Sequence, residues 1–152
     1  MELHPVNYID ALFVATNMRD WDKTEIYATR WNDDPADIAT DSCECGDFAW
    51  IAYNPEPVAI IGAVPIHPGV WSVFMFATDK FSNIAISLTK YAKRVIIPSL
   101  ANAGAHRLEC KSMEGHTVAQ KWLEFIGARP ETVLENYGRN GEDFILYKYL
   151  WS

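Results

Sequence analysis

Hydrophobic and polar residues follow two different periods along this chain, and the changes of period separate predicted helices from predicted strands. Within residues 2–20, apolar residues recur at close to helical spacing, and Asn7 or Pro5 stands near a plausible start. Residues 20–45 are acidic and polar. Pro35 opens a second, short predicted helix there, because proline favours the first turn of a helix.

Three apolar runs with strand character come next. Residues 48–53 and 58–66 flank the turn Asn54-Pro55-Glu56-Pro57, which predicts an antiparallel hairpin. Pro68 and Gly69 mark another turn before a third run, 70–77. The pattern therefore predicts three neighbouring strands followed by a helix.

The helical period returns over residues 84–101, where Pro98 should kink or stop the helix. Residues 107–111 predict a short strand, and residues 117–126 a helix. In that helix Trp122 should face the core, and Gly127 should end it in a left-handed conformation. A final hairpin is expected around an Asn-Gly turn, with strands near 133–134 and 144–150. Without repeats or linkers, residues 1–152 predict a single α/β domain.

Composition narrows the classes of function. The 152 residues are 49% hydrophobic, with six Trp, seven Tyr and seven Phe, so a large aromatic core is expected. Thirteen basic and twenty acidic residues give a net charge of −7, which disfavours nucleic-acid and anionic-membrane partners. No apolar run approaches the roughly 20 residues of a membrane span. Together with the lack of a basic region followed by an apolar signal core at the N-terminus, this predicts a cytosolic protein. The three cysteines lack metal-finger spacing, so we expect reduced thiols and no metal site.

The order of elements from Trp71 to Ala128 resembles the cofactor half of the GCN5-related N-acetyltransferases (GNATs). In those enzymes a loop of pattern [Gln/Arg]-x-x-Gly-x-[Gly/Ala] holds the pyrophosphate of acetyl-CoA through backbone N–H groups. The matching run here is Lys80-Phe81-Ser82-Asn83-Ile84-Ala85. The resemblance implies a GNAT-like α/β fold, with a twisted, mostly antiparallel central sheet, one splayed strand pair and flanking helices. It also implies acetyl-CoA as the cofactor.

The resemblance carries a set of cofactor-binding positions onto this chain: Phe76, Ala77, Thr78, Lys80, Phe81, Ser82, Asn83, Ile84 and Ala85. We expect a cleft lined by Phe76, Thr78, Phe81 and His116. Asn83 and Ala85 hold the glycine positions of the loop, and Asn tolerates left-handed conformations. An ordinary strand-to-helix turn, capped by Ser82 or Asn83, is the alternative.

Three residues are candidate catalytic groups: Glu25, Glu109 and His116. The helix pattern Asn-x-x-Ala-x-x-Phe-Tyr-x-x-x-Gly-Phe of the family aligns with residues 116–128, and Leu123 stands where its tyrosine protonates the leaving thiolate. His116 could substitute as an acid, or it could simply cap the helix. Glu25, near Asp22 in the acceptor-side segment, and Glu109 on a strand are the candidate bases for the substrate amine.

A closer resemblance, to the tailed-phage family of GNAT-like internal virion proteins, covers nearly the whole chain. It is carried by Met18-Arg19-Asp20-x-Asp22-x-x-Glu25-Ile26, Gly69-Val70-Trp71, Ala77-Thr78-Asp79, Arg107-Leu108-Glu109-Cys110, Trp122-Leu123-x-x-Ile126-Gly127-Ala128 and residues 137–144. It implies a phage protein in the host cytoplasm or the virion that works mainly through contacts with phage or host proteins, with catalysis lost or weak. The alternative is an acetyl-CoA or other acyl-CoA-dependent N-acyltransferase acting on a protein or small-molecule amine.

The acidic segment is the predicted partner surface under the first of these hypotheses. Residues 20–44 gather many carboxylates, which would attract a basic partner. Trp21, Tyr27 and Trp31 are spaced too unevenly for one helical face, so we expect at least one to be exposed.

Overall fold

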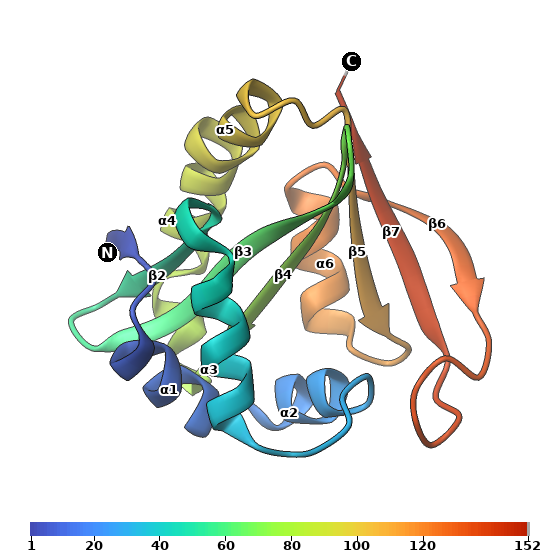
Figure 1. Cartoon of the computed structure of the whole chain (residues 1–152), viewed down its shortest axis with the longest axis horizontal. Coiled ribbons are helices and arrows are strands. Elements are labelled where there is room, and N and C mark those ends of the chain that lie inside the picture. Colours follow the sequence, from blue (N-terminus) through green and yellow to red (C-terminus); the bar gives the residue numbers. More distant parts are fainter. Residues whose placement is uncertain (152) are drawn as a thin grey trace.

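A computed structural model describes residues 1–151, which form a single seven-stranded sheet with helices on both faces (Figure 1). The strands are β1 (Glu2–Pro5), β2 (Ala49–Tyr53), β3 (Pro57–His67), β4 (Val70–Ala77), β5 (Arg107–Met113), β6 (Arg129–Leu134) and β7 (Phe144–Leu150). The α-helices are α1 (Tyr8–Thr16), α2 (Asp20–Tyr27), α3 (Pro35–Glu44), α4 (Ala85–Tyr91), α5 (Ile97–Asn102) and α6 (Thr117–Phe125). Short helical turns η1 (Gly46–Phe48), η2 (Asp79–Asn83) and the π-helical η3 (Ala92–Ile96) complete the chain.

The sheet runs in the order β1-β2-β3-β4-β5-β7-β6, and every neighbouring pair is antiparallel except β4 and β5. Those two strands are parallel, and they pair only over Val70–Ser72 and Arg107–Glu109. Beyond these residues they diverge, as Figure 1 shows between the green and brown arrows. The predicted α/β fold with one splayed strand pair is therefore confirmed.

Each face of the sheet carries its own hydrophobic core. On one face, α1 and α3 cover Ile51, Ile60 and Phe76. On the other, residues of α4, α5 and α6 pack against Ile61 and Leu108. Ile60 and Ile61 belong to different cores because successive side chains of a strand point to opposite faces.

The long helix after β4 does not stop at Pro98. Residues 85–102 are helical throughout, but the turn before Pro98 widens into η3, where the Ile97 N–H bonds to the Ala92 carbonyl. Pro98 has no N–H to donate and its ring crowds the preceding turn, so a wider turn accommodates it without ending the helix.

The N-terminal region departs from the single helix predicted over residues 2–20. Residues 2–5 form β1, because they pair with the edge of β2, and long-range pairing overrides local periodicity. Helix α1 then begins after Asn7, whose side chain accepts a hydrogen bond of 2.9 Å from the Asp10 N–H. Pro35 opens α3 as expected, whereas α2 was not predicted.

The final hairpin forms, but a long loop replaces the expected two-residue Asn-Gly turn. Residues 135–143 connect β6 to β7 and dock on the segment after α2. The Arg139 N–H donates to the Ala28 carbonyl at 2.7 Å, and its guanidinium lies 2.5 Å from an Asp33 oxygen. These contacts join segments that are far apart in the sequence, so a local turn signal does not predict them. They hold the loop in a conformation wider than a two-residue turn.

Helix α6 ends as its sequence predicts. Gly127 has a φ of +103°, in the left-handed region. The Ala128 N–H donates to the Leu123 carbonyl at 2.9 Å, which closes the end of the helix.

Replacing Trp122 tests the packing of α6 on the sheet. Trp122 is buried, and its indole N–H donates to Thr89 Oγ1 at 2.9 Å. Trp122→Ala should lower the free energy of unfolding by about 3–5 kcal/mol, because it removes a large core side chain. Chemical denaturation measures this. Phe125→Ala on the same helix, where the side chain is 71% exposed, is the control and should change stability by less than about 0.5 kcal/mol. Equal stability of the two variants would contradict the observed packing.

Candidate active site

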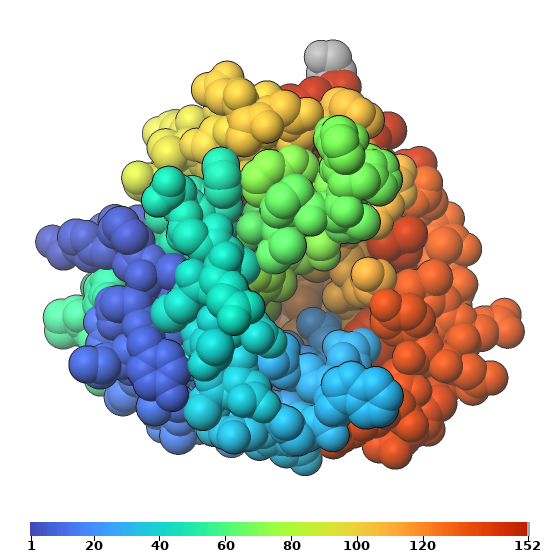
Figure 2. Space-filling model, viewed as in Figure 1, coloured from blue at the N-terminus to red at the C-terminus, as the bar shows by residue number. Residues whose placement is uncertain are grey.

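A cavity of about 390 Å³ opens where β4 and β5 diverge. Its lining comes from α2 on one face of the sheet, from α5 and α6 on the other, and from β3, β4, β5 and β7 between them. It therefore passes through the sheet where the pairing of β4 with β5 ends, after Ser72 and Glu109, a point that we call the fork. Figure 2 shows its opening as a hollow between the light-blue α2 region, the green β3–β4 region and the orange C-terminal region.

The edge of β4 inside this cavity carries backbone groups without a strand partner. The Thr78 N–H donates to Val58 of β3 at 2.8 Å, whereas the Ala77 N–H points away from β3 and donates to Asp22 at 2.8 Å. Backbone groups alternate sides along a strand, so those of Met75 point the same way as those of Ala77. Because the pairing of β4 with β5 ends at Ser72, Met75, which pairs with Ile61 of β3, has no strand partner on its β5 side among residues 1–151. An extended ligand could bind there as an added strand.

The start of α2 closes the outer end of β4. The Arg19 N–H donates to the Ala77 carbonyl at 2.9 Å, and its guanidinium makes two hydrogen bonds of 3.0 Å to the Asp22 carboxylate. That guanidinium also lies over the Phe81 ring, 4.8 Å from its centre. Burial raises the pKa of the Asp22 carboxyl, while Arg19 and the Ala77 N–H act in the opposite direction.

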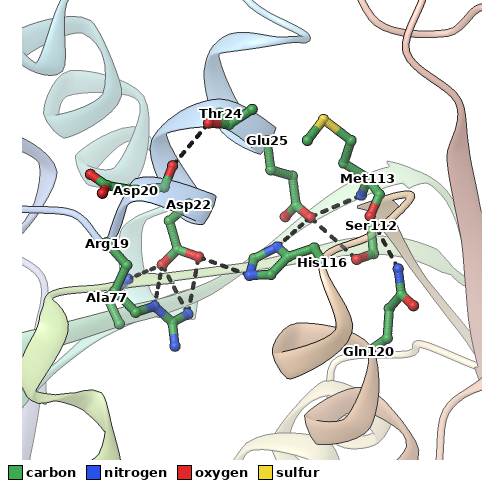
Figure 3. Close-up of polar contacts among 10 residues, drawn as sticks. All are labelled: Arg19, Asp20, Asp22, Thr24, Glu25, Ala77, Ser112, Met113, His116 and Gln120. Atoms are coloured by element: carbon green, nitrogen blue, oxygen red, sulfur yellow. Dashed lines mark hydrogen bonds and ion pairs between the residues drawn. The ribbon is translucent and has the colours of Figure 1, made fainter.

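His116 links this end of β4 to the end of β5 (Figure 3). Its Nε2 lies 3.4 Å from Asp22, and its Nδ1 lies 2.8 Å from Glu25. The same Glu25 oxygen accepts hydrogen bonds from the Met113 N–H at 2.9 Å and from the Ser112 hydroxyl at 3.2 Å. The two carboxylates, three residues apart on α2, therefore tie both diverging strands to one helix.

His116 is a buried member of this network. It is 98% buried, since 2% of its surface is exposed, and the Trp21 ring stacks on it at 5.4 Å between ring centres. It does not line the cavity, whereas Glu25 does. We had expected His116 to line the cleft, and that expectation was wrong because Trp21 and the start of α2 cover it.

Glu109 lies at the fork itself. It is the last residue of β5 that pairs with β4, and it lines the cavity. Leu108 belongs to the core under α5 and α6, and Met113 packs beside Ala28 after α2, so alternation turns Glu109 toward the α2 face. One of its carboxylate oxygens accepts a hydrogen bond of 2.8 Å from Arg107 Nε. The structure thus decides the facing of Glu109, which alternation alone had left open.

The expected cofactor positions after β4 divide into buried and exposed groups. Phe76, Ala77, Thr78, Phe81 and Ile84 are buried, Ala85 is half-buried, and Lys80, Ser82 and Asn83 are exposed. None of them lines the cavity, so the expected lining by Phe76, Thr78 and Phe81 was also wrong. The reason is that the start of α2 packs across the end of β4, which moves the opening to Ser72–Met75.

The loop itself is helical and unstrained. Thr78 caps η2 by accepting from the Lys80 N–H at 3.3 Å, and the Lys80 amine pairs with Glu56 at 2.5 Å. No residue from 78 to 85 has a positive φ, so Asn83 occupies a glycine position without needing left-handed backbone. The expected capping of the following helix by Ser82 or Asn83 was wrong, because the N-cap of α4 is Ile84 and no side chain caps it.

Sequence reasoning missed several residues of this site. The spacing of Arg19, Asp22 and Glu25 by threes places them on one face of a helix, and that signal could have found the network. Nothing in the sequence identifies the unpaired edge at Met75 or the cavity-facing Tyr147, because both depend on where the sheet diverges.

No family model matches the sequence, and no curated protein sequence matches it. Solved protein structures, in contrast, do match the fold of this chain. The chain superposes with a TM-score of 0.77 on the ribosomal-protein-alanine N-acetyltransferase of Brucella melitensis, at 12% identity, covering 99% of this chain and 100% of that one. A GNAT-family acetyltransferase of Bacillus anthracis gives 0.73 at 15% identity, covering 97% and 93%. The chain has the GNAT acetyltransferase fold.

A third GNAT-like structure includes the cofactor. The yncA protein of Salmonella typhimurium, solved with acetyl-CoA, superposes with a TM-score of 0.73 at 10% identity, covering 100% of this chain and 94% of that one. Within residues 1–151, no helix is long and apolar enough to cross a membrane, and no cluster of three His, Cys, Asp or Glu side chains is placed to hold a metal ion.

The structural role of Glu25 can be tested by stability. Glu25→Ala leaves the Met113 N–H and the Ser112 hydroxyl without their acceptor, so the free energy of unfolding should fall by about 2–3 kcal/mol. Glu25→Gln keeps an oxygen acceptor and should lose less. Urea denaturation measures both. Lys23→Ala, exposed on the same helix, is the control and should stay within about 0.5 kcal/mol of the parent. Unchanged stability of Glu25→Ala would mean that α2 is not held by this carboxylate.

Proposed function

We propose that this protein is an acyl-CoA-dependent N-acyltransferase. The observation that carries the proposal is the cavity that crosses the sheet at the β4–β5 fork, with the unpaired edge of β4 along its wall. Such a cavity lets a thioester enter from the α5–α6 face and an amine from the α2 face. The two reactants can then meet between the strands, held in position for reaction.

The residues present fit the pantetheine arm of a coenzyme A. The arm is extended and carries amide groups, which match the free N–H and C=O groups of Met75. Ala119 and Trp122 of α6 and Leu100 of α5 give the cavity apolar walls on that face. Lys80, Ser82 and Asn83 are exposed on η2 just after β4, where the loop of the family holds the pyrophosphate.

The proposed reaction uses Glu109 as the base. A bound acyl-CoA would supply the acyl group as a thioester. Glu109 lies at the fork on the α2 face and would take the proton that the attacking amine loses, through the carboxylate oxygen that Arg107 leaves free. The carboxylates of Glu25 and Glu109 on this side would attract the protonated amine of a protein or a small molecule. That amine would lose one proton to solvent before it attacks, and Glu109 would take the second proton as the amide forms.

Filling the cavity from α6 tests coenzyme binding. Ala119→Trp places an indole where the pantetheine arm would lie, so the affinity for acetyl-CoA should fall at least tenfold, as measured by calorimetry. Val118→Trp introduces the same side chain at the neighbouring position, which is 58% exposed and does not line the cavity, and it should bind like the parent. Failure of the parent to bind acetyl-CoA would reject the proposed function.

A contact role in a phage virion or an infected host cell is a second proposal, which follows from the resemblance of the sequence. The observation in its favour is Trp31, which is fully exposed (102%) in the acidic segment between α2 and α3. Trp21 is also 44% exposed, so at least one of the three aromatic residues is exposed, as expected. Exposed tryptophans are common anchors of protein interfaces.

Trp31 gives a sharper test of this role than the nearby carboxylates. Asp33 pairs with Arg139 and Asp34 caps α3, so changing either would also disturb the fold. Trp31→Ala should lower capture of a phage or host protein at least tenfold, because a truncated hot spot costs about 2 kcal/mol or more. Pull-down followed by measurement of affinity for the captured protein checks this. Ile86→Ala, exposed on α4, is the control, and equal capture by both variants would reject this surface.

A further inference from the structure

Lys111 is a cation on the wall of the cavity that the protein itself leaves without a counter-ion. The residue lines the cavity, and its side chain is exposed. On the same part of the sheet, Arg107 pairs with Glu109 and Glu131, and Lys148 also pairs with Glu131. Lys111 forms no ion pair with the carboxylates of residues 1–151. An unpaired ammonium group beside a cavity attracts an anionic group on the molecule that binds there.

The strand register places Lys111 on the same face of the sheet as Glu109. The two residues are two positions apart on β5, so both side chains project to the α2 face from points about 6.6 Å apart. Lys111 lies opposite Leu146 of β7 and Glu109 opposite Lys148, without a shift in register. The Lys111 amine lies 5.8 Å from the centre of the Tyr137 ring, which also lines the cavity. The unpaired cation therefore lies on the side of the cavity where the proposed base acts.

The room on this side suits a small acceptor. The cavity of about 390 Å³ is near the lower end of the range for small-molecule pockets, about 300–1,000 Å³. The end of the acyl-CoA arm would share that volume. Thr29 after α2 and Tyr137 of the loop 135–143 both line the cavity. Arg139 joins these two segments, because it donates hydrogen bonds to the carbonyls of Ala28 and Arg30.

The charges on this side suit an acceptor with two opposite groups. Glu109 would attract the amine, as argued above, and one unpaired cation balances one negative charge, which a carboxylate supplies. A free amino acid carries both groups on one carbon atom. The flexible four-carbon stem of lysine lets its amine reach along the strand toward a group held at Glu109.

On the proposed function of the site, we propose that the acceptor is a free amino acid and that Lys111 binds its carboxylate. The amine lone pair forms the C–N bond to the acyl carbon, and the electron pair of the C–S bond leaves with the sulfur as a thiolate. One proton of the ammonium group goes to solvent and the second to Glu109. Lys111 takes no part in these steps and selects the acceptor through its charge.

The experiment compares amino acids with their amides, in which a neutral group replaces the carboxylate. The common protein amino acids, each with its amide, and a peptide with a free N-terminus are offered with acetyl-CoA to the full-length protein. Release of the thiol gives kcat/KM. The parent should prefer at least one amino acid over its amide by roughly tenfold to a hundredfold, because hydrogen bonds between charged groups are strong. Lys111→Met should abolish this preference and leave kcat/KM for the amide unchanged.

Two further variants separate the charge of Lys111 from its packing. Lys111→Arg keeps a cation and should keep most of the preference. Lys23→Met removes the same charge from an exposed position of α2 that does not line the cavity, and it should behave like the parent. Each ratio is compared between parent and variant, so the different basicity of the amine in an acid and its amide cancels.

The outcomes separate this inference from the proposed function. A preference that survives in Lys111→Met, or that Lys23→Met loses equally, overturns the role of Lys111. A parent that binds acetyl-CoA but acylates only the peptide, treats acids and amides alike, or acylates none of the panel overturns the amino-acid acceptor. Each of these results leaves the acyltransferase proposal standing. Failure of the parent to bind acetyl-CoA rejects that proposal and this inference with it.

Discussion

The structure depends on the short pairing between β4 and β5. These two strands are parallel neighbours in the sheet but share only three residue pairs. Because β4 continues to Ala77 without β5 beside it, the sheet contains an opening that side chains alone do not fill. Both the cavity and the unpaired backbone at Met75 follow from this one divergence.

Helix α2 keeps the fork open at its wide end. Asp22 accepts from the last N–H of β4, Glu25 accepts from the last N–H of β5, and His116 lies between the two carboxylates (Figure 3). Burying charges is costly unless each one is paired and hydrogen-bonded. Here Arg19 supplies two hydrogen bonds to Asp22, and three donors converge on Glu25, so the network is satisfied and can hold the two strands at a fixed separation.

The site differs from the family pattern at the positions where sequence reasoning looked for chemistry. Leu123 replaces a tyrosine, and Asn83 replaces a glycine, which suggested lost catalysis. The structure weakens both arguments. Asn83 lies in an unstrained helical turn, and Tyr147 of β7 lines the same cavity as Leu123. A missing motif residue therefore does not by itself remove a chemical group from a site.

The sequence alone determined the strands and helices whose signals are local. Strand β4 and helix α6 were predicted within a residue at each end, and Gly127 ended α6 in the predicted conformation, because periodicity and capping act over a few neighbouring residues. Only the tertiary structure decided where the cavity opens, which way Glu109 faces, and that Glu25 and His116 meet although 91 positions separate them. Those features depend on where β4 and β5 diverge and on how α2 packs across the ends of both strands. Both are contacts between segments that are far apart in the sequence, so no local pattern of residues predicts them.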